Sequence, residues 1–356
     1  MQADSRGKLI LIPYRLLGNI LVREVGRAYQ RRGYTVYYGP ENFYESEIVP
    51  DIIHLHWPEM FYRNDGEGTV EERAEMFLAR LRDFKARGIR IIWTIHNLFP
   101  HDTYDNDLDV RVYRAVSDLA DVVVHHCERS RDLIAENYPP RAGVPQVIAP
   151  MGHYKAQRNE SDMAESRRRL GLPTDAFVFL LFGALKGYKG LFNVIEAFRG
   201  LKSSGRPIYL VVAGSASVSG WRGRFLDLRN RVPHRWQGRL RLHLGHVPAD
   251  DVQYFVNACD AMILGHVRGL NSSLALLGMT FGKLIVGPDL GCIGWVLHQG
   301  QNIAFPVGDQ GAMQQAMQDA LSFDLASAAA ANHAITDFWS WDHHADQILA
   351  GLDRVR

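Results

Sequence analysis

The residues with the clearest chemistry are the glycines and lysines that follow the apolar run from Phe179 to Phe182. Residues 182–190 read Phe-Gly-Ala-Leu-Lys-Gly-Tyr-Lys-Gly and lead into a helical pattern from Leu191 to Leu201. Glycine lets a ligand approach the backbone closely, Lys186 and Lys189 supply positive charge, and a helix N-terminus attracts anions. These features predict a phosphate or diphosphate site. An ordinary strand-to-helix turn with surface lysines explains the segment equally well.

Neither of the common nucleotide motifs fits this turn. A Walker motif needs Lys followed by Ser or Thr, and the dinucleotide fingerprint needs the order G-x-G-x-x-G. A second small-residue segment, residues 269–273, contains Asn271, Ser272 and Ser273 and precedes a helical run from Leu274 to Phe281. The N–H groups and hydroxyls at such a helix start can hold a second part of a diphosphate, although N-capping alone also explains them.

Polar side chains also follow the expected strands of the first half. They are His54, His56, Trp57 and Glu59 after one strand, and His96, Asn97, His101 and Asp102 after another. His54 and His56 share a strand face because side chains alternate, and His96 can add a third imidazole. A metal site in a metal-dependent hydrolase is therefore one interpretation, but carboxylate ligands are scarce. We instead expect one strand histidine to be buried and hydrogen-bonded and the other to face a ligand.

A proton-accepting group is expected in the same loops. Asp102, His101 and Glu59 are the candidate bases, because each residue type can take a proton from a hydroxyl group. The run from Asp105 to Asp109 contains overlapping D-x-D patterns but precedes a helical run from Val110 to Leu119. Acidic residues there cap the helix and interact favourably with its dipole. We therefore expect a structural role for this run, and neither a bound metal nor a cofactor.

Short apolar runs that alternate with amphipathic helical patterns predict parallel α/β sheets, whose strands must position these groups. The expected strands are Lys8–Pro13, Thr35–Tyr38, Asp51–Leu55, Ile89–Thr94, Asp121–Val124 and Gln146–Ile148, then Phe177–Phe182, Ile208–Ala213, Leu240–Leu244, Ala261–Leu264, Leu284–Val286 and Ile303–Phe305. We expect two Rossmann-like, doubly wound domains that face a central cleft, with ligands at the carboxyl ends of the strands. Their expected bounds are residues 1–152 and 153–335. Residues 336–356 should hold one helix, from Phe338 to Val355, that packs back on the first domain.

Composition narrows the possible partners and the location. The chain has 356 residues, of which 40 are basic and 39 acidic, so its overall charge does not indicate nucleic acid as a partner. Its apolar runs are shorter than the roughly 18 to 20 residues that a bilayer-spanning helix needs, and the N-terminus lacks a signal-peptide profile. We expect a cytoplasmic protein.

The order of the motifs resembles the group-1 clan of nucleotide-sugar glycosyltransferases, which have the two-domain GT-B fold. Residues 182–190 look like the clan's glycine-x-leucine-x-x-x-lysine-glycine turn, and residues 244–248 look like its loop beside the donor base. Residues 258–286 resemble its aspartate strand, glycine loop, helix and glycine-lysine strand. The resemblance implies a donor site for a nucleotide-diphosphate sugar. The implied donor-site residues are Gly183, Lys186, Lys189, Gly214, His246, Val247, Asn271, Ser272 and Ser273.

A narrower resemblance concerns the first half, where residues 54–58 and 93–97 look like acceptor loops of β-mannosyltransferases in xanthan-like exopolysaccharide assembly. It implies acceptor-binding roles for His56, Trp57, His96 and Asn97, and transfer from GDP-mannose or a UDP-sugar to a glycan or a lipid-linked oligosaccharide. The helical run from Leu16 to Arg32 adds a basic amphipathic face. This face contains Arg15, Arg23, Arg27, Arg31 and Arg32. It suits peripheral contact with the anionic inner face of a membrane, although a solvated helix face explains it as well.

The sequence departs from the clan at three charged positions. Two glutamates of most retaining members fall here on Gly269 and Leu277, and the arginine of the phosphate turn is Ala184. The missing carboxylates favour a metal-independent, inverting mechanism in which a base of the first domain deprotonates the acceptor and lysines stabilise the departing diphosphate. They also leave a non-catalytic nucleotide- or glycan-binding module as an alternative, beside the metal-dependent hydrolase.

Overall fold

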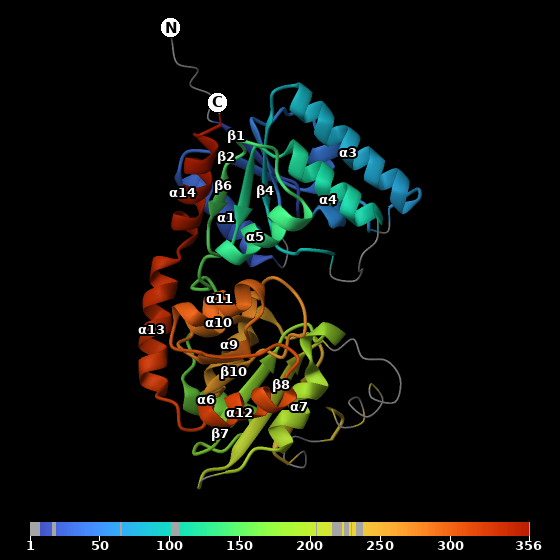
Figure 1. Cartoon of the computed structure of the whole chain (residues 1–356). Helices are drawn as coiled ribbons and strands as arrows, with labels where there is room; N and C mark the ends of the chain where they lie inside the picture. Colours follow the sequence, from blue (N-terminus) through green and yellow to red (C-terminus); the bar gives the residue numbers. More distant parts are fainter. Residues whose placement is uncertain are drawn as a thin grey trace. The chain divides into compact units, whose positions relative to one another are not determined.

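The chain forms two compact units, Met1–Gly152 with Trp339–Arg356, and His153–Phe338. The computed structural model describes residues 8–15, 19–64, 66–100, 107–203, 205–215, 223, 228, 230–232 and 238–355. Each unit contains a six-stranded sheet of parallel strands with helices on both faces (Figure 1). This is the doubly wound α/β architecture that the sequence predicts.

The sheet of the first unit has the strand order β2-β1-β3-β4-β5-β6. Its strands are β1 (Leu9–Ile12), β2 (Thr35–Tyr38), β3 (Ile52–Leu55), β4 (Arg90–Thr94), β5 (Val122–His125) and β6 (Gln146–Ile148). The helices are α1 (Ile20–Arg31), α2 (Pro40–Tyr44), α3 (Val70–Ala86), α4 (Asp107–Leu119), α5 (Glu128–Asn137) and α14 (Trp341–Leu352), with a short 3₁₀ turn η1 (Pro58–Phe61) after β3.

The sheet of the second unit has the order β12-β11-β10-β7-β8-β9. Its strands are β7 (Phe177–Phe182), β8 (Ile208–Gly214), β9 (Leu240–Leu244), β10 (Ala261–Ile263), β11 (Leu284–Pro288) and β12 (Ile303–Phe305). The helices are α6 (Met163–Leu170), α7 (Leu191–Arg199), α9 (Val252–Ala258), α10 (Ser273–Thr280), α11 (Gly291–Gln299), α12 (Gln310–Ala320) and α13 (Leu325–Phe338), with 3₁₀ turns η2 (Gly187–Lys189) and η4 (Ala249–Asp251).

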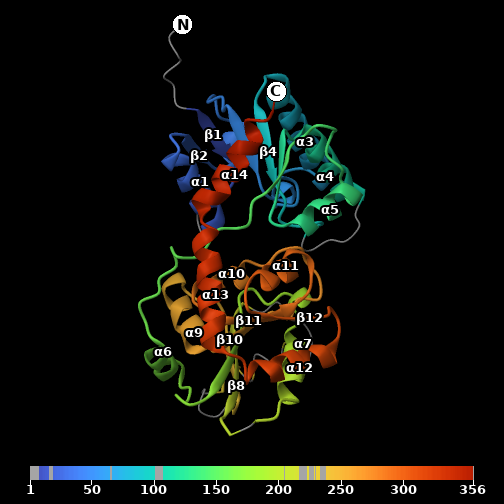
Figure 2. The ribbon, with the colours of Figure 1, turned by 60° about the vertical axis from the view of Figure 1, so that its left-hand side comes forward.

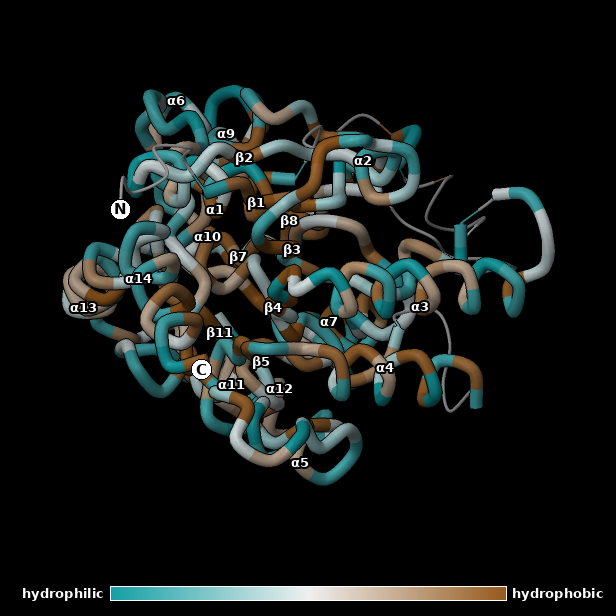
Figure 3. The backbone as a smooth tube through the Cα atoms, turned by 90° about the horizontal axis from the view of Figure 1, so that it is seen from above, coloured by the Kyte–Doolittle hydropathy of each residue, from teal (hydrophilic) through white to brown (hydrophobic). Residues whose placement is uncertain are grey.

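All twelve strands expected from the sequence are confirmed, with ends that shift by two residues at most. They are recognisable because strands of a parallel sheet are covered on both faces and so form continuous apolar runs. In β7 every residue is buried. Figure 3 shows brown, hydrophobic backbone at several of the labelled strands, β1, β7 and β8 among them.

Helix ends depend on local capping, and several differ from the expected positions. The single helix expected from Phe338 to Val355 is wrong: α13 ends at Phe338 and α14 begins at Trp341. The hydroxyl of Ser340 accepts a hydrogen bond from the His343 N–H at 3.0 Å, and this N-cap starts the new helix. In the same way Asn19 caps α1, which begins at Ile20.

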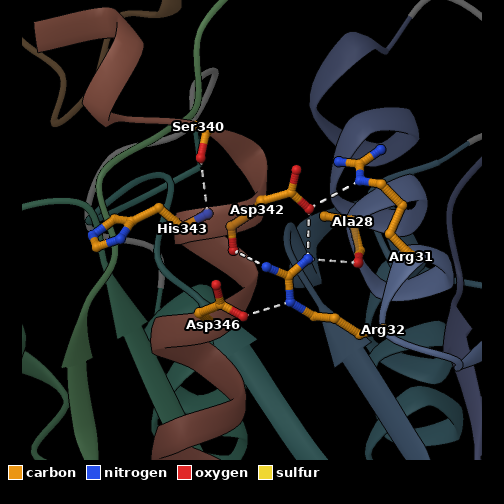
Figure 4. A network of polar contacts seen from close by, with 7 residues as sticks. All are labelled: Ala28, Arg31, Arg32, Ser340, Asp342, His343 and Asp346. Carbon is orange, nitrogen blue, oxygen red and sulfur yellow. Dashed lines mark hydrogen bonds and ion pairs between the residues drawn. The ribbon is translucent and has the colours of Figure 1, made fainter.

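Helix α14 packs on α1 and on strands β5 and β6 of the first unit (Figure 2). One guanidinium, that of Arg32, fastens α14 to α1 (Figure 4). It donates to the Asp346 carboxylate at 2.5 Å, to the Asp342 carboxylate at 2.6 Å and to the Asp342 carbonyl at 2.6 Å. Arg31 adds one bond to Asp342 at 2.9 Å. Sequence-distant residues therefore fix the C-terminal helix to the first sheet.

The same contacts change the interpretation of the basic face on α1. Arg23 and Arg27 both pair with Glu24, at 3.0 and 2.9 Å, and Arg31 and Arg32 pair with the carboxylates of α14. Much of the positive charge that the sequence offers for membrane contact is thus neutralised within the first unit. Among the helices of the described residues, none has both the length and the apolar content needed to span a bilayer.

Replacing Arg32 with alanine should destabilise the first unit, while replacing Arg31 should change its stability little. Arg32 is 19% exposed and makes several charged hydrogen bonds, whereas Arg31 is 49% exposed and makes one ion pair. We expect Arg32→Ala to lower the free energy of unfolding by about 1–2 kcal/mol, and Arg31→Ala by about 0.5 kcal/mol or less. Urea denaturation of the full chain measures both changes, and equal effects of the two variants would contradict this assignment.

Candidate functional site

In the second unit the strand order reverses at β7, whose neighbours are β10 and β8. Doubly wound sheets bind ligands outside the carboxyl ends of the strands at such a reversal. The loop that follows β7 contains the glycine turn, residues 183–190, and the loop that follows β10 is residues 264–272. The predicted diphosphate residues therefore lie where this fold places a ligand.

Glycines allow these two loops to pack backbone against backbone. Gly190 has φ of 60°, and a Cβ atom there would lie 2.1 Å from the carbonyl oxygen of Gly265. The two loops are also joined by a hydrogen bond from the Val267 N–H to the Tyr188 carbonyl at 2.9 Å. Gly214 has φ of 126°, and a Cβ atom on it would lie 2.0 Å from the Gly183 carbonyl oxygen. Larger residues at Gly190 and Gly214 are incompatible with this packing.

Lys189 is the best-defined cation of this edge. Burial, and then the neighbouring charge of Lys186, lower the pKa of Lys189 to about 8. Its Nζ atom lies 3.6 Å from the point that a Cβ atom on Gly183 would occupy. No carboxylate of the described residues forms an ion pair with Lys189 or contributes to its pKa. A partly buried ammonium beside a second lysine, without an acid to balance it, favours an anionic ligand.

The start of α10 lies beside Gly183 and Lys189. A Cβ atom on Gly183 would lie 3.4 Å from the Leu274 side chain, so the glycine turn, Lys189 and the first turn of α10 are neighbours. Ser272 occupies the N-cap position of α10, and its side chain makes no capping hydrogen bond. The N-capping explanation for this serine is therefore not what the structure shows. The structure thus brings two of the predicted residues, Gly183 and Lys189, beside the first turn of α10, the helix that begins at Ser273 with Ser272 at its N-cap position.

The remaining donor-site predictions lie along the same edge of the sheet. Gly214 ends β8, and the Gly245 N–H after β9 donates to its carbonyl at 3.1 Å. His246 is exposed and Val247 half-buried in the following loop. Because β9 is separated from β7 by β8, this loop lies farther from Lys189 than α10 does. The expected role of His246 and Val247 beside a base stays a prediction.

In the first unit, histidine and aromatic side chains gather at the carboxyl ends of β3, β4 and β5. The rings of His54 and His56 have centroids 4.2 Å apart on one strand face, as their spacing predicts. His56 Nδ1 lies 3.0 Å from His96 Nε2, and Trp57 stacks on His96 with centroids 4.3 Å apart. The phenol oxygen of Tyr14 accepts the backbone N–H groups of His56 and Trp57 at 3.0 and 2.9 Å.

The expectation that only one of the two strand histidines is buried is wrong, since His54 is 0% and His56 1% exposed. Both ring nitrogens of His54 are already engaged, with the Tyr29 hydroxyl at 3.1 Å and the Thr94 hydroxyl at 2.7 Å. Within the described part of the chain, which includes His54, His56 and His96, no group of histidine, cysteine or acidic side chains could hold a metal ion. The metal-dependent hydrolase built on these histidines is therefore not supported.

Glu59 is the candidate base that the structure describes. It is half-buried on η1, and burial raises the pKa of its carboxyl, against the opposing effect of a hydrogen bond from Tyr113. The Tyr113 hydroxyl donates to Glu59 Oε2 at 2.7 Å. His101 and Asp102, the other two candidate bases, lie outside the described residues. Asn97 is 7% exposed after β4, on the same side of the sheet.

Helix α4 holds the loop that contains Glu59. Asp109 accepts hydrogen bonds from Tyr62 at 2.6 Å and from Arg63 at 2.7 and 2.6 Å. Tyr113 is four residues further along, on the same face of α4. Asp109 therefore has a structural role through Tyr62 and Arg63, which is a different contact from the helix capping that the sequence predicts for the acidic run. The sequence did not lead us to Tyr14 or Tyr113. Tyr14 could have been identified from its position directly after the first strand, whereas no pattern in the sequence distinguishes Tyr113.

Comparisons with known proteins agree with this arrangement. A family model described as Glycosyl transferases group 1 matches residues 162–335. Over 242 residues the chain is 24% identical to the GDP-mannose:glycolipid 4-beta-D-mannosyltransferase of Xanthomonas campestris pv. campestris. That match covers 67% of this chain and 61% of the relative, which is less than two thirds of the relative's length.

Similar folds are found among solved structures. Sucrose-phosphate synthase from Thermosynechococcus elongatus aligns with a TM-score of 0.72 at 16% identity and covers 98% of both chains. The Anabaena protein HepE, solved in complex with UDP and glucose, aligns with a TM-score of 0.70 at 14% identity and covers 98% of this chain and 100% of its own. These likenesses are of fold, and they confirm the expected two-sheet architecture.

Acid should destabilise the first unit through its buried histidines. Burial lowers the pKa of His126 to about 3 and the pKa values of His125 and His344 to about 4. Unfolded histidines bind protons below about pH 6.5, so this stability is present above that pH and is lost on acidification, by about 1.4 kcal/mol per pH unit for each group. Thermal midpoints should therefore fall steadily from pH 6.5 to 4.5.

Two asparagine variants test the source of that loss. His344→Asn should make the pH dependence shallower, while His343→Asn, at a less buried neighbouring position, should leave it unchanged. A thermal midpoint that is constant between pH 6.5 and 4.5 in the unmodified chain would show that the histidines are not held neutral by the fold.

Proposed function

We propose that this chain, which belongs to the group-1 glycosyltransferases with the GT-B fold, transfers a sugar from a nucleotide-diphosphate sugar to a hydroxyl group of a glycan or lipid-linked acceptor. The observation that supports this proposal most directly is the position of Lys189. It lies beside Gly183 and the start of α10, its pKa is lowered to about 8, and no acid of the described residues pairs with it.

A diphosphate would complete this site electrostatically. Its negative charges would favour the protonated form of Lys189, and Lys186 would share them. The exposed N–H groups at the start of α10 add donors from a second direction. The name of the Xanthomonas relative contains GDP-mannose, and HepE was solved with UDP. We therefore propose GDP-mannose or a UDP-sugar as the donor.

The residues at the two missing glutamate positions favour an inverting reaction. Gly269 has φ of 122°, which side chains rarely adopt, and Leu277 is buried within α10. Neither position offers a carboxylate to the sugar. We therefore assign the base to the first unit, where Glu59 has a raised pKa and is oriented by Tyr113.

In the proposed step the Glu59 carboxylate takes the proton of the acceptor hydroxyl. The hydroxyl oxygen then forms a bond to the anomeric carbon while the bond from that carbon to the diphosphate oxygen breaks. The electron pair of that bond leaves on the diphosphate. Lys186, Lys189 and the N–H groups of α10 stabilise the negative charge that the diphosphate gains as it leaves, so the positive charge that this step needs comes from the chain itself.

For the acceptor we propose a glycan or a glycolipid intermediate, as in exopolysaccharide assembly, presented at the inner face of a membrane. The relative from Xanthomonas acts on a glycolipid according to its name. On this chain Met60 is 55% exposed on η1, between Glu59 and the buried Phe61. An exposed apolar side chain next to the candidate base suits a lipid-linked acceptor. We also propose that the protein is located in the cytoplasm.

Replacing Lys189 should remove the response of the chain to nucleoside diphosphates. UDP or GDP at a hundred times its dissociation constant should stabilise the folded chain by about 2.7 kcal/mol, seen as a higher thermal midpoint. Lys189→Ala should abolish this shift, while Lys202→Ala, at an exposed lysine of the same unit, should retain it.

The same lysine predicts a pH dependence of binding. Because the free protein holds Lys189 with a pKa of about 8, affinity for the diphosphate should fall as the pH rises above 8, and the Ala variant should lack this decline. Full stabilisation by UDP or GDP after Lys189→Ala would refute the assignment.

Replacing Glu59 should stop transfer without stopping donor binding. General-base catalysis contributes about 10²–10⁴-fold, so Glu59→Gln should lower kcat by at least about 100-fold and leave the thermal shift by UDP or GDP intact. In the unmodified chain kcat should fall as the pH drops through the raised pKa of Glu59, since only the ionised carboxylate accepts a proton.

Glu71→Gln, at an exposed site on α3, is the matched control and should keep full activity. Transfer by Glu59→Gln at the unmodified rate would move the base elsewhere. Binding of the diphosphate with no transfer by any variant or by the unmodified chain would favour a non-catalytic binding module.

A further inference from the structure

The first unit has a cavity of about 480 Å³ at the edge of its sheet where β5 and β6 begin. The charged residues that line it are Lys85, Asp121, Arg141 and Arg354. Asp121 directly precedes β5, and residues 141–145 directly precede β6. Glu59 and His96, in contrast, follow the other ends of β3 and β4. Because the strands are parallel, the cavity lies at the opposite edge of the sheet from the candidate base.

The C-terminal end of α14 brings Arg354 to this cavity. A Cβ atom on Gly351 would lie 2.6 Å from the Val147 side chain of β6 and 3.2 Å from the Val122 side chain of β5. The absence of a side chain at Gly351 therefore lets α14 pack closely on the starts of both strands. The helix ends at Leu352, and Arg354 follows two residues later.

A glycine turn before β6 brings Arg141 to the same cavity. The Val144 N–H donates to the Arg141 carbonyl at 3.2 Å and closes the turn of residues 141–144. Gly143 has φ of 83°, a conformation that side chains rarely adopt. A Cβ atom on Gly143 would have no other atom within 4 Å, so the space beside the turn is open.

The lining of the cavity has an excess of positive charge. Asp121 balances Lys85, because its Oδ1 atom forms an ion pair with Lys85 Nζ, and its Oδ2 atom accepts a backbone N–H of β4 at 2.9 Å. Arg141 and Arg354 are both exposed and have no acid of their own. Arg141 donates once, to the Ala120 carbonyl at 3.3 Å, and the Arg354 side chain forms neither a hydrogen bond nor an ion pair with the described residues. Two guanidinium groups are thus open to an anion.

The size and the remaining lining of the cavity indicate what kind of anion fits. A guanidinium group presents its N–H donors in a planar fork that matches the oxygens of a phosphate group. Small-molecule sites have volumes of about 300–1,000 Å³, and this cavity lies within that range, so it has room for more than a phosphate ion. Its apolar wall includes Val144, Pro145 and Val355, which suits the carbon part of a ligand.

We propose that this cavity binds a small organic phosphate, of the size of a sugar phosphate, through Arg141 and Arg354. The phosphate oxygens accept hydrogen bonds from both guanidinium groups, while Lys85 stays paired with Asp121. The bound ligand links the end of α14 to the turn before β6, and it stabilises the first unit because it binds only the folded chain. The site does not depend on the proposed function, since its residues take no part in sugar transfer.

Calorimetric titration of the full chain with glucose 1-phosphate, at constant ionic strength, tests the site. We expect saturable binding, and Arg141→Gln and Arg354→Gln should each raise the dissociation constant at least about tenfold, because each removes charged hydrogen bonds to the phosphate. Arg354→Gln removes no side-chain contact with the described residues, so it should fold as the unmodified chain does. Arg114→Gln, at an exposed arginine of α4, is the matched control and should bind normally. Equal affinities of the control and both cavity variants, or no binding by the unmodified chain, would overturn the proposal.

Two further titrations separate this cavity from the donor site and from general attraction of anions. Lys189→Ala should bind glucose 1-phosphate as tightly as the unmodified chain, and loss of binding in this variant alone would place the ligand at the glycine turn of the second unit and overturn the proposal. Glucuronate carries one negative charge, whereas a phosphate ester carries nearly two at pH 7, so glucuronate should bind at least about tenfold more weakly. Equal affinity for glucuronate would overturn the assignment to phosphates. A chain that binds glucose 1-phosphate in this cavity but transfers no sugar would overturn the proposed function alone.

Discussion

In both sheets every strand runs parallel to its neighbours, and the position of each chemical group depends on that constraint. Each connection between parallel strands must cross back over the sheet, so the loops that leave the strands all emerge at one edge. The glycine turn after β7 thereby meets the loop after β10, with Gly190 against Gly265. In the first sheet the same rule gathers His56, His96 and His126 from three strands. Residues that are far apart in the sequence therefore become neighbours because the strands before them lie side by side in the sheet.

Burial shifts a pKa in opposite directions at the carboxyl edges of the two sheets. Desolvation favours the neutral form of any group, so it lowers the pKa of Lys189 and raises the pKa of Glu59. A lysine in that state gains most from an anionic ligand, and a carboxylate in that state is a stronger base. The second unit is thus suited to stabilise a departing diphosphate. The first unit, with Glu59 and its neutral imidazoles, is suited to receive a proton. A displacement at the sugar carbon needs both functions, because the acceptor hydroxyl loses a proton as the diphosphate departs.

The strands and the donor loops follow from the sequence because their signals are local. An apolar run ended by glycine, as at residues 177–183, specifies a buried strand and the turn after it. The burial of both His54 and His56 could not be predicted, because it depends on Tyr29, Thr94 and His96, which other elements supply. The neutralised basic face of α1 depends on carboxylates of α14 some 310 residues away. The start of α14 likewise rests on one capping bond, from the His343 N–H to the Ser340 hydroxyl.

The most direct test of the account is a transfer assay on the full chain with UDP-sugars, GDP-mannose and a polyprenyl-diphosphate-linked oligosaccharide, read by mass spectrometry. The account predicts that with one of these donors the acceptor gains a single hexose while an equal amount of nucleoside diphosphate is released. The new linkage should have the anomeric configuration opposite to that of the donor. Release of free sugar at a rate that does not depend on the acceptor, or retention of the donor's configuration, would contradict it.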